Sequence, residues 1–300
     1  MDLYFMVHLT GTVSSFASMI CSFVIIIHLC FEIKKFSLFK RQPLINRLQL
    51  YISIVDINFN LFHGTDHLYQ LIHKVPLDPI PCKIIAFTSN SAFNAMGLQS
   101  CFVTIASFIV VVLNIKLLFW KFDLINFVFV FGIPILMNII SESLHLNGFN
   151  GTWCMFITKI DVNVMLYLFY GGLFMWLNFI SSFICYSAII GKLIISTSRV
   201  QALTANKNLN SQKHNNPDKS LQMKTTLRFM IFMLALFIQW LPLSIYLVYQ
   251  MLITVEIPLV LVGMVTIFSN IGGIINLIYY MSFRKRKVGP TAARPQTVTT

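Results

Sequence analysis

Long apolar stretches alternate with shorter polar stretches along this chain. A membrane-crossing helix needs about 20 consecutive, mostly apolar residues. Seven stretches of that kind, separated by charged or turn-rich segments, cover residues 4–31, 46–71, 81–113, 124–140, 163–195, 227–253 and 257–282. The pattern therefore predicts an all-α membrane protein, built as a seven-transmembrane helix bundle.

The polar segments complete the predicted domain organisation. Residues 197–224 are polar and rich in asparagine, and we expect them to form a flexible loop. We expect one membrane domain over residues 1–288 and a short cytoplasmic tail over 289–300. No internal repeat is visible, which weakens the case for a transporter built from inverted repeats.

The composition excludes most soluble classes. Of the 300 residues, 57% are apolar and 11% are charged, and the mean hydropathy is +0.76. Ordinary soluble domains contain about 25% charged residues, and a soluble globule of this size could not bury so much apolar surface. A soluble enzyme, a nucleic-acid-binding protein and a disordered regulator are therefore poor interpretations, and the expected surroundings are a lipid bilayer.

The basic residues predict the orientation of the bundle. With the amino terminus outside, 19 of the 22 lysines and arginines lie in inner segments, and only Lys74, Lys83 and Lys159 lie outside. Lysine and arginine collect on the cytoplasmic side of membrane proteins. We therefore expect an extracellular amino terminus and a cytoplasmic carboxyl terminus, in the plasma membrane. The formal charge of +12 is mostly a consequence of this topology and needs no nucleic acid.

Two features of the outer side agree with that orientation. Asn150-Gly151-Thr152 is an acceptor sequence for N-glycosylation and lies in an outer connection. Cys82 and Cys154 both fall on the outer side, where disulfides can form. The six cysteines include no C-x-x-C pair, so a zinc site or a redox motif has no support.

Seven helices, an outer amino terminus and that cysteine pair together resemble the G-protein-coupled receptor superfamily, over residues 4 to 288. Asp56 is similar to the buried carboxylate of the second helix in rhodopsin-like members, which implies a transmission core there and a sodium or proton site. Trp240-Leu241-Pro242 resembles the Trp-x-Pro of the sixth helix, where proline kinks the backbone. Asn276 and Tyr280 resemble the Asn and Tyr of Asn-Pro-x-x-Tyr in the seventh helix, so Asn276 is expected to bond to Asp56 and Tyr280 to act as an inner switch.

The sequence also departs from that pattern. Ala106-Ser107-Phe108 occupies the place of Asp/Glu-Arg-Tyr, and Leu277 replaces the proline of Asn-Pro-x-x-Tyr. Residues 82–87, 151–154 and 167–172 are more similar to the cyclic-AMP-receptor-like receptors of amoebae and fungi, although we transfer no cyclic-nucleotide ligand from them. Residues 283–287 resemble a short juxtamembrane helix, and their basic cluster also suits lipid headgroups.

The polar residues of the third stretch divide into two groups. Gln99, Ser100 and Thr104 are expected to hydrogen-bond to neighbouring helices. Residues nearer the outer end are placed to line a ligand cavity above Trp240; they are Ser89, Asn90, Phe93 and Asn94. A further group at the outer end of the second stretch could join that cavity or could be a solvated loop edge: His63, Asp66 and His67.

We therefore expect a receptor that binds a small extracellular molecule and activates a heterotrimeric G protein, without enzymatic activity. We expect no cofactor, and the only metal that the resemblance suggests is sodium at Asp56. The expected G-protein face comprises Lys116, Lys121, Lys224 and Arg228. The rival interpretation is a transporter or channel for small polar solutes, with the polar third helix as its path. A seven-helix metal-dependent enzyme is the weakest rival, because only residues 63–67 offer clustered ligands.

Overall fold

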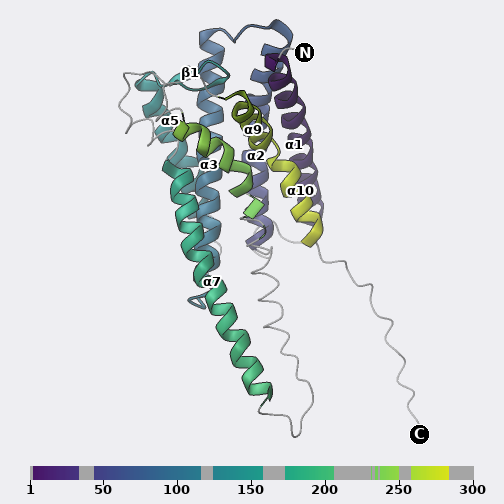
Figure 1. Cartoon of the computed structure of the whole chain (residues 1–300), viewed down its shortest axis with the longest axis vertical. Helices are drawn as coiled ribbons and strands as arrows, with labels where there is room; N and C mark the ends of the chain where they lie inside the picture. The colour runs from purple at the N-terminus through teal and green to yellow at the C-terminus, as the bar shows by residue number, and fades with distance from the viewer. Residues whose placement is uncertain are drawn as a thin grey trace, which may run out of the picture.

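The computed structural model is a bundle of long helices capped at one end by a small hairpin (Figure 1). It describes residues 3–33, 44–115, 124–157, 173–205, 231, 234–235, 237–249 and 258–283. The labelled helical elements are α1 (Leu3–Ile33), α2 (Leu44–His73), α3 (Pro79–Val111), η1 (Val128–Gly132), α5 (Ile133–Ser143), α7 (Leu173–Ala205), α9 (Leu259–Asn270) and α10 (Gly272–Phe283). A shorter apolar helix, Phe237–Tyr249, is called the Pro242 helix below. Each of the seven predicted apolar stretches contains a described helix.

The helices pack so that α1 and α3 contact most of the others. α1 packs against α2, α9 and α10, and α3 packs against α2, α5 and α7. The hairpin pairs β1 (Asn147–Phe149) with β2 (Cys154–Phe156) in antiparallel register, with Gly148 opposite Met155. Figure 1 shows the amino terminus and the hairpin at one end of the bundle, and the carboxyl end of α7 at the other.

Several described helices have the length and hydropathy of membrane spans. They are Tyr4–Phe31, Pro79–Val111 and Leu124–Ser143, and α9 with α10 would add a fourth as a pair bent by 44°. α2 is long enough but more polar, because it carries residues such as Asp56, His63 and Asp66. Those side chains are buried inside the bundle, where polar groups can find partners.

The carboxyl end of α7 differs from the sequence prediction. α7 continues to Ala205, into the stretch expected as a flexible loop from residue 197. The added residues include Arg199, Gln201 and Leu203, which are good helix formers, so the helix continues although much of this segment is polar. The remainder of that loop, the start of the predicted fifth helix and residues 284–287 of the predicted juxtamembrane segment lie outside the described residues.

The predicted seventh helix is broken rather than continuous. α9 ends at Asn270 and α10 begins at Gly272, across Ile271. Two successive glycines lower helix propensity at this point. The fourth helix also changes locally, into the π-helical turn η1. Pro134 has no N–H to donate to the Val130 carbonyl four residues earlier, which favours such a wider turn.

Polar residues in the carboxyl-terminal half of α3 bond to neighbouring helices, as expected. Asn126 Nδ2 donates to Gln99 Oε1 at 3.2 Å, and the Thr104 hydroxyl lies 3.3 Å from that of Ser182 in α7. At the end of α3, Lys192 Nζ donates to the Val112 carbonyl at 2.6 Å. A lysine at this place satisfies a carbonyl that has no partner within its own helix.

Candidate functional site

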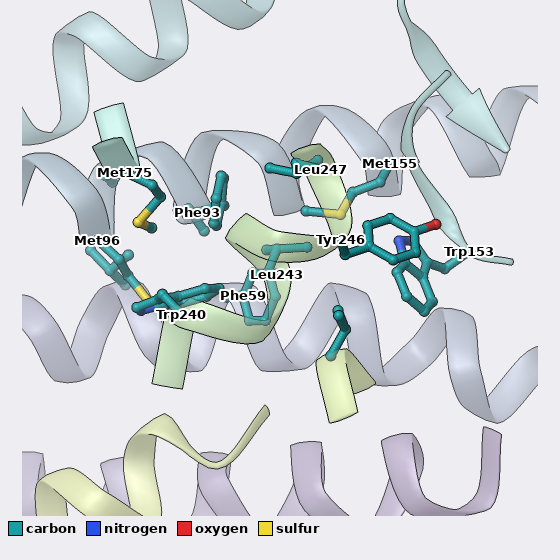
Figure 2. Packing of buried hydrophobic residues seen from close by; sticks show 14 of the residues in the cluster. Phe59, Phe93, Met96, Trp153, Met155, Met175, Trp240, Leu243, Tyr246 and Leu247 are labelled. Carbon is teal, nitrogen blue, oxygen red and sulfur yellow. The ribbon is translucent and has the colours of Figure 1, made fainter. Parts of the chain in front are cut away.

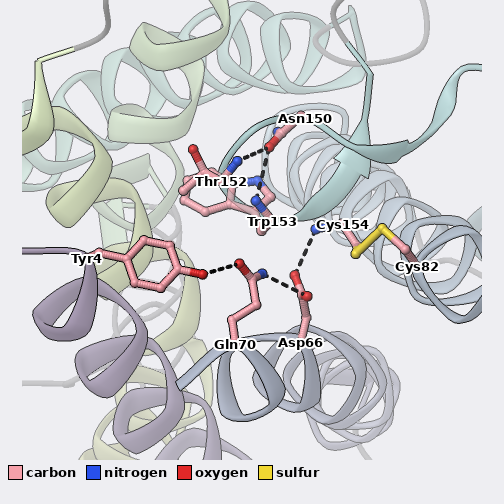
Figure 3. The surroundings of a disulfide bond; sticks show 8 residues. All are labelled: Tyr4, Asp66, Gln70, Cys82, Asn150, Thr152, Trp153 and Cys154. Carbon is pink, nitrogen blue, oxygen red and sulfur yellow. Dashed lines mark hydrogen bonds between the residues drawn. A yellow bond between two sulfur atoms is a disulfide. The ribbon is translucent and has the colours of Figure 1, made fainter. Parts of the chain in front are cut away.

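A disulfide attaches the hairpin to α3. Cys82, in the first turn of α3, is bonded to Cys154 in β2, and the two Cα atoms lie 5.2 Å apart (Figure 3). The pair expected from the sequence is therefore present. A second tether is formed by Asn147, whose Oδ1 accepts from Asn90 Nδ2 of α3 at 3.0 Å. Hairpin and α3 thus form one unit at this end of the bundle.

The hairpin turn directs Trp153 into the bundle. Asn150 Oδ1 accepts hydrogen bonds from the backbone N–H groups of Thr152 and Trp153, both at 3.1 Å, and Gly151 adopts a positive φ of 101°. Glycine tolerates that backbone conformation without steric cost. Trp153 is 1% exposed, and with Met155 it joins the main buried cluster of the protein (Figure 2). The sequence did not indicate this role, because Trp153 lies in a short polar loop.

The five residues expected to line a ligand cavity are all buried. They are Ser89, Asn90, Phe93, Asn94 and Trp240. Phe93 and Trp240 meet edge to face with ring centroids 5.0 Å apart, in the same cluster as the hairpin's Trp153 (Figure 2). The structure thus brings Phe93 and Trp240 together with a hairpin side chain, Trp153. Whether they contact a ligand stays a prediction.

Asp66 connects α2 to the hairpin. Its Oδ2 accepts from the backbone N–H of Cys154 at 2.7 Å, and its Oδ1 accepts from Gln70 Nε2 at 2.9 Å (Figure 3). The Tyr4 hydroxyl of α1 donates in turn to Gln70 Oε1 at 2.9 Å. Asp66 is fully buried, so the interpretation of this group as a solvated loop edge is wrong. The hairpin covers the end of α2, and spacing along one helix could not show that.

Three histidines form a second contact between α1 and α2, and we call them the histidine chain. His8 Nδ1 of α1 lies 3.0 Å from His67 Nδ1 of α2, and His67 Nε2 lies 3.3 Å from His63 Nε2. Each ring is at most 2% exposed. Trp153 packs edge-on against both α2 rings, at centroid distances of 5.8 Å to His63 and 6.1 Å to His67. His8 was not a candidate in the sequence, because nothing along the chain relates it to α2.

Asp56 is the centre of the inner polar cluster. Its Oδ2 accepts from the hydroxyl of Ser22 at 2.7 Å and from that of Ser18 at 3.3 Å, both in α1. The backbone N–H of Gly273, in α10, donates to Ser18 Oγ at 2.6 Å. Asp56 Oδ1 is buried and has no hydrogen-bond partner among the described residues. The cluster thus joins α1, α2 and α10 through one carboxyl group.

Four further predicted residues lie in the Pro242 helix and in α10. Trp240 contacts Phe59 of α2 at a centroid distance of 5.7 Å, and Pro242 lies in the same helix. Asn276 is 2% exposed, and its coupling to Asp56 stays a prediction. The Tyr280 hydroxyl lies 2.6 Å from His28 Nδ1 of α1, a partner that the sequence did not suggest. The four basic residues of the expected G-protein face lie outside the described residues.

A stripe of small residues on α1 allows these close contacts. It consists of Gly11, Ser15, Ser18 and Ser22. A Cβ atom on Gly11 would lie 2.6 Å from His67, and one on Gly64 of α2 would lie 2.7 Å from Ser15. Small residues at helical spacing let two membrane helices approach closely. This spacing is the sequence feature that indicates the α1–α2 contact.

Metal binding is not supported by the described ranges: none of their groups of three or more histidine, cysteine or carboxylate side chains is placed to hold a metal ion. The histidine chain illustrates the reason. His67 faces His8 with one ring nitrogen and His63 with the other, so the three rings do not converge on one point.

Comparison with known proteins gives a match of fold alone. No protein-family model matches this chain, and no curated protein matches it by sequence. Among solved structures, the crystal structure of squid rhodopsin matches with a TM-score of 0.72 at 15% identity, over 92% of this chain and 81% of that chain. Sequence identity this low carries no ligand or partner across. The chain therefore has a rhodopsin-like fold.

Proposed function

We propose that this protein is a receptor that changes its helix packing when a small molecule binds at the hairpin end, and that it activates a heterotrimeric G protein from the other end. The observation that carries the proposal is a continuous line of ring contacts on a rhodopsin-like fold. Trp153 of the hairpin contacts His63, His63 contacts Phe59, and Phe59 contacts Trp240. Movement of the hairpin would therefore be transmitted directly to the Pro242 helix.

The proposed orientation places the hairpin outside the cell. The disulfide supports it, because disulfides persist in oxidising compartments, and so does the distribution of lysine and arginine. The amino terminus lies at the hairpin end of the bundle (Figure 1). In this orientation Asn150 is available for glycosylation, and the protein is a multi-pass protein of the plasma membrane.

The proposed switch lies between the two ends. Pro242 removes one backbone hydrogen bond from its helix and so lowers the cost of bending there. Asp56 with Asn276 would stabilise one packing of the bundle beneath Trp240. Tyr280 would act as a switch at the inner end, where its contacts would differ between the two packings. The unpartnered Asp56 Oδ1 could take a sodium ion or a proton in that state. A ligand shifts such an equilibrium only by its difference in affinity for the two packings.

The experiment is guanine-nucleotide exchange on a panel of Gα subunits, in membranes that contain the protein. The test variant is Pro242→Ala, and the matched control is Pro134→Ala, which changes a proline of another described helix outside the proposed switch. We expect exchange above that of empty membranes, altered by Pro242→Ala and unaltered by Pro134→Ala.

The same preparation tests the rival function. If no Gα subunit responds, and vesicles with the protein conduct small polar solutes that empty vesicles retain, the receptor proposal is wrong. The protein would then be a transporter or channel. The buried polar residues of α2 and α3 are the observation that would favour that function.

A further inference from the structure

The histidine chain has a fixed hydrogen-bonding capacity. Three neutral imidazoles carry three N–H groups and three ring lone pairs. The contacts His8–His67 and His67–His63 use two of each. One N–H and one lone pair remain, and they fall on the two outermost atoms, His8 Nε2 and His63 Nδ1. Both atoms are buried and have no hydrogen-bond partner among the described residues.

One added proton fits this arrangement, and a second does not. A fourth N–H can be accommodated with both inter-ring hydrogen bonds intact, because the two terminal atoms then both carry hydrogen. The positive charge can lie on any of the three rings, since shifting the shared protons moves it along the chain. A fifth N–H would place two hydrogens between the same pair of nitrogens and break that bond. The geometry therefore allows a stoichiometry of one proton.

The groups around the histidine chain come from α1, α2 and the hairpin. From α1, the Tyr4 ring lies 4.3 Å from that of His8, and the backbone at Gly11 lies against His67. From α2, Asp66 is the acidic neighbour, and the groups that donate to it, Gln70 Nε2 and the Cys154 N–H, are both neutral. From the hairpin, Trp153 packs against His63 and His67, and its own ring lies 5.6 Å from that of Tyr246 in the Pro242 helix.

We propose that the histidine chain is a proton-binding site, and that its protonation releases Trp153 and the hairpin from the bundle. The ligand is a single proton, taken from the side of the membrane on which the hairpin lies. With the orientation proposed above, this is the extracellular side. The proton site itself depends on neither that orientation nor coupling to a G protein.

Protonation of the histidine chain is coupled to the hairpin because the protonated histidines lack acceptors for their two terminal N–H groups. Once protonated, the histidine chain presents an N–H at each end, and a buried charge with unpaired donors is costly unless water or an acceptor reaches it. The ends of the chain lie against aromatic rings, Tyr4 at His8 and Phe59 with Trp153 at His63. Water can therefore reach His63 when Trp153 separates from it, and this opening lowers the free energy of the protonated state.

The test is amide hydrogen exchange of the hairpin, residues 147–156, in the purified full-length protein with chelator present, between pH 7.5 and pH 5.5. The variant is His67→Phe, which removes the central imidazole. The matched control is His73→Phe, because His73 lies on the same helix but is exposed. The hairpin has no side chain that titrates in this range, since Cys154 is bonded to Cys82. The ratio of exchange rates between two proteins at one pH therefore cancels the intrinsic effect of pH.

We expect the hairpin to exchange faster in the native protein than in His67→Phe as the pH falls. The ratio of the native exchange rate to that of His67→Phe should rise by at most about tenfold for each unit by which the pH falls, which is the limit for uptake of one proton. His73→Phe should behave as the native protein does. If His67→Phe does not retain its disulfide and native thermal midpoint at pH 7.5, His63→Gln and His8→Gln replace it.

Three results would overturn the proposal. One is a ratio that does not change with pH or that falls with acidification. Another is a rise steeper than one proton allows. The third is a pH response that appears only when chelator is omitted, since that would assign the imidazoles to a metal ion. A failure of G-protein activation would leave the exchange result unaffected, so the two proposals are tested separately.

Discussion

Replacing Gly273 by alanine should force α10 away from α1. A Cβ atom on Gly273 would lie 2.5 Å from Ser22 Oγ and 2.6 Å from Asp56 Oδ2, and closer still to the backbone carbonyl oxygen of Ser18. A side-chain rotation cannot move that carbonyl, so the helices themselves must separate, and the Gly273–Ser18 hydrogen bond is strained or lost. Overpacking a buried contact costs about 1–3 kcal/mol. We expect a loss at the upper end of that range.

Two other glycines of the same predicted helix provide graded controls. A Cβ atom on Gly272 would lie 2.5 Å from Gln239 Nε2 and from Asp56 Oδ1, which are ends of side chains and can move, so we expect a loss of about 1–2 kcal/mol. Gly263 has nothing within 4 Å, and alanine there should be neutral or should stabilise the helix by up to about 1 kcal/mol. Thermal unfolding in detergent should therefore rank Gly263→Ala as most stable, Gly272→Ala next and Gly273→Ala last. Equal midpoints for Gly263→Ala and Gly273→Ala would refute the close contact of α10 with α1.

Further predictions concern the hairpin and the inner core. Cys82→Ser should lower stability by about 2–5 kcal/mol and reduce surface expression; non-reducing peptide mapping that finds this cysteine free in the native protein would contradict it. Asp66→Asn should cost about 1–3 kcal/mol, because the amide NH₂ must face one of two buried donors, and limited proteolysis of the hairpin should accelerate at neutral pH. Glycosidase should shift the mobility of the protein from cells, and Asn150→Gln should abolish that shift; labelling of the hairpin only from the cytosol would reverse the proposed topology. Asp56→Asn and Asn276→Asp should have non-additive effects on basal signalling, whereas additive effects would show that the two side chains do not interact.

The sequence alone determined that this chain forms a helical membrane bundle. Hydropathy is a local property of each segment. An apolar segment in lipid must satisfy its backbone hydrogen bonds internally, which a helix does, and each predicted apolar stretch does contain a described helix. The position of Cys82 and Cys154 near the ends of apolar stretches was likewise local information, and the prediction of their disulfide followed from it together with the family resemblance. Asp56 stood out because a carboxyl group in a membrane helix must face the bundle interior.

Tertiary structure decided which side chains meet. His8 and His67 lie on different helices, and their contact depends on the rotation of α1 and on the absence of a side chain at Gly11. Trp153 follows a polar turn, yet it is buried in the core, because the disulfide and the Asp66 hydrogen bond hold the adjacent Cys154 against α2 and α3. The break at Ile271 brings the α10 backbone to Ser18. Each of these contacts joins residues far apart in the chain, so its free energy depends on helix packing that periodicity and composition do not encode.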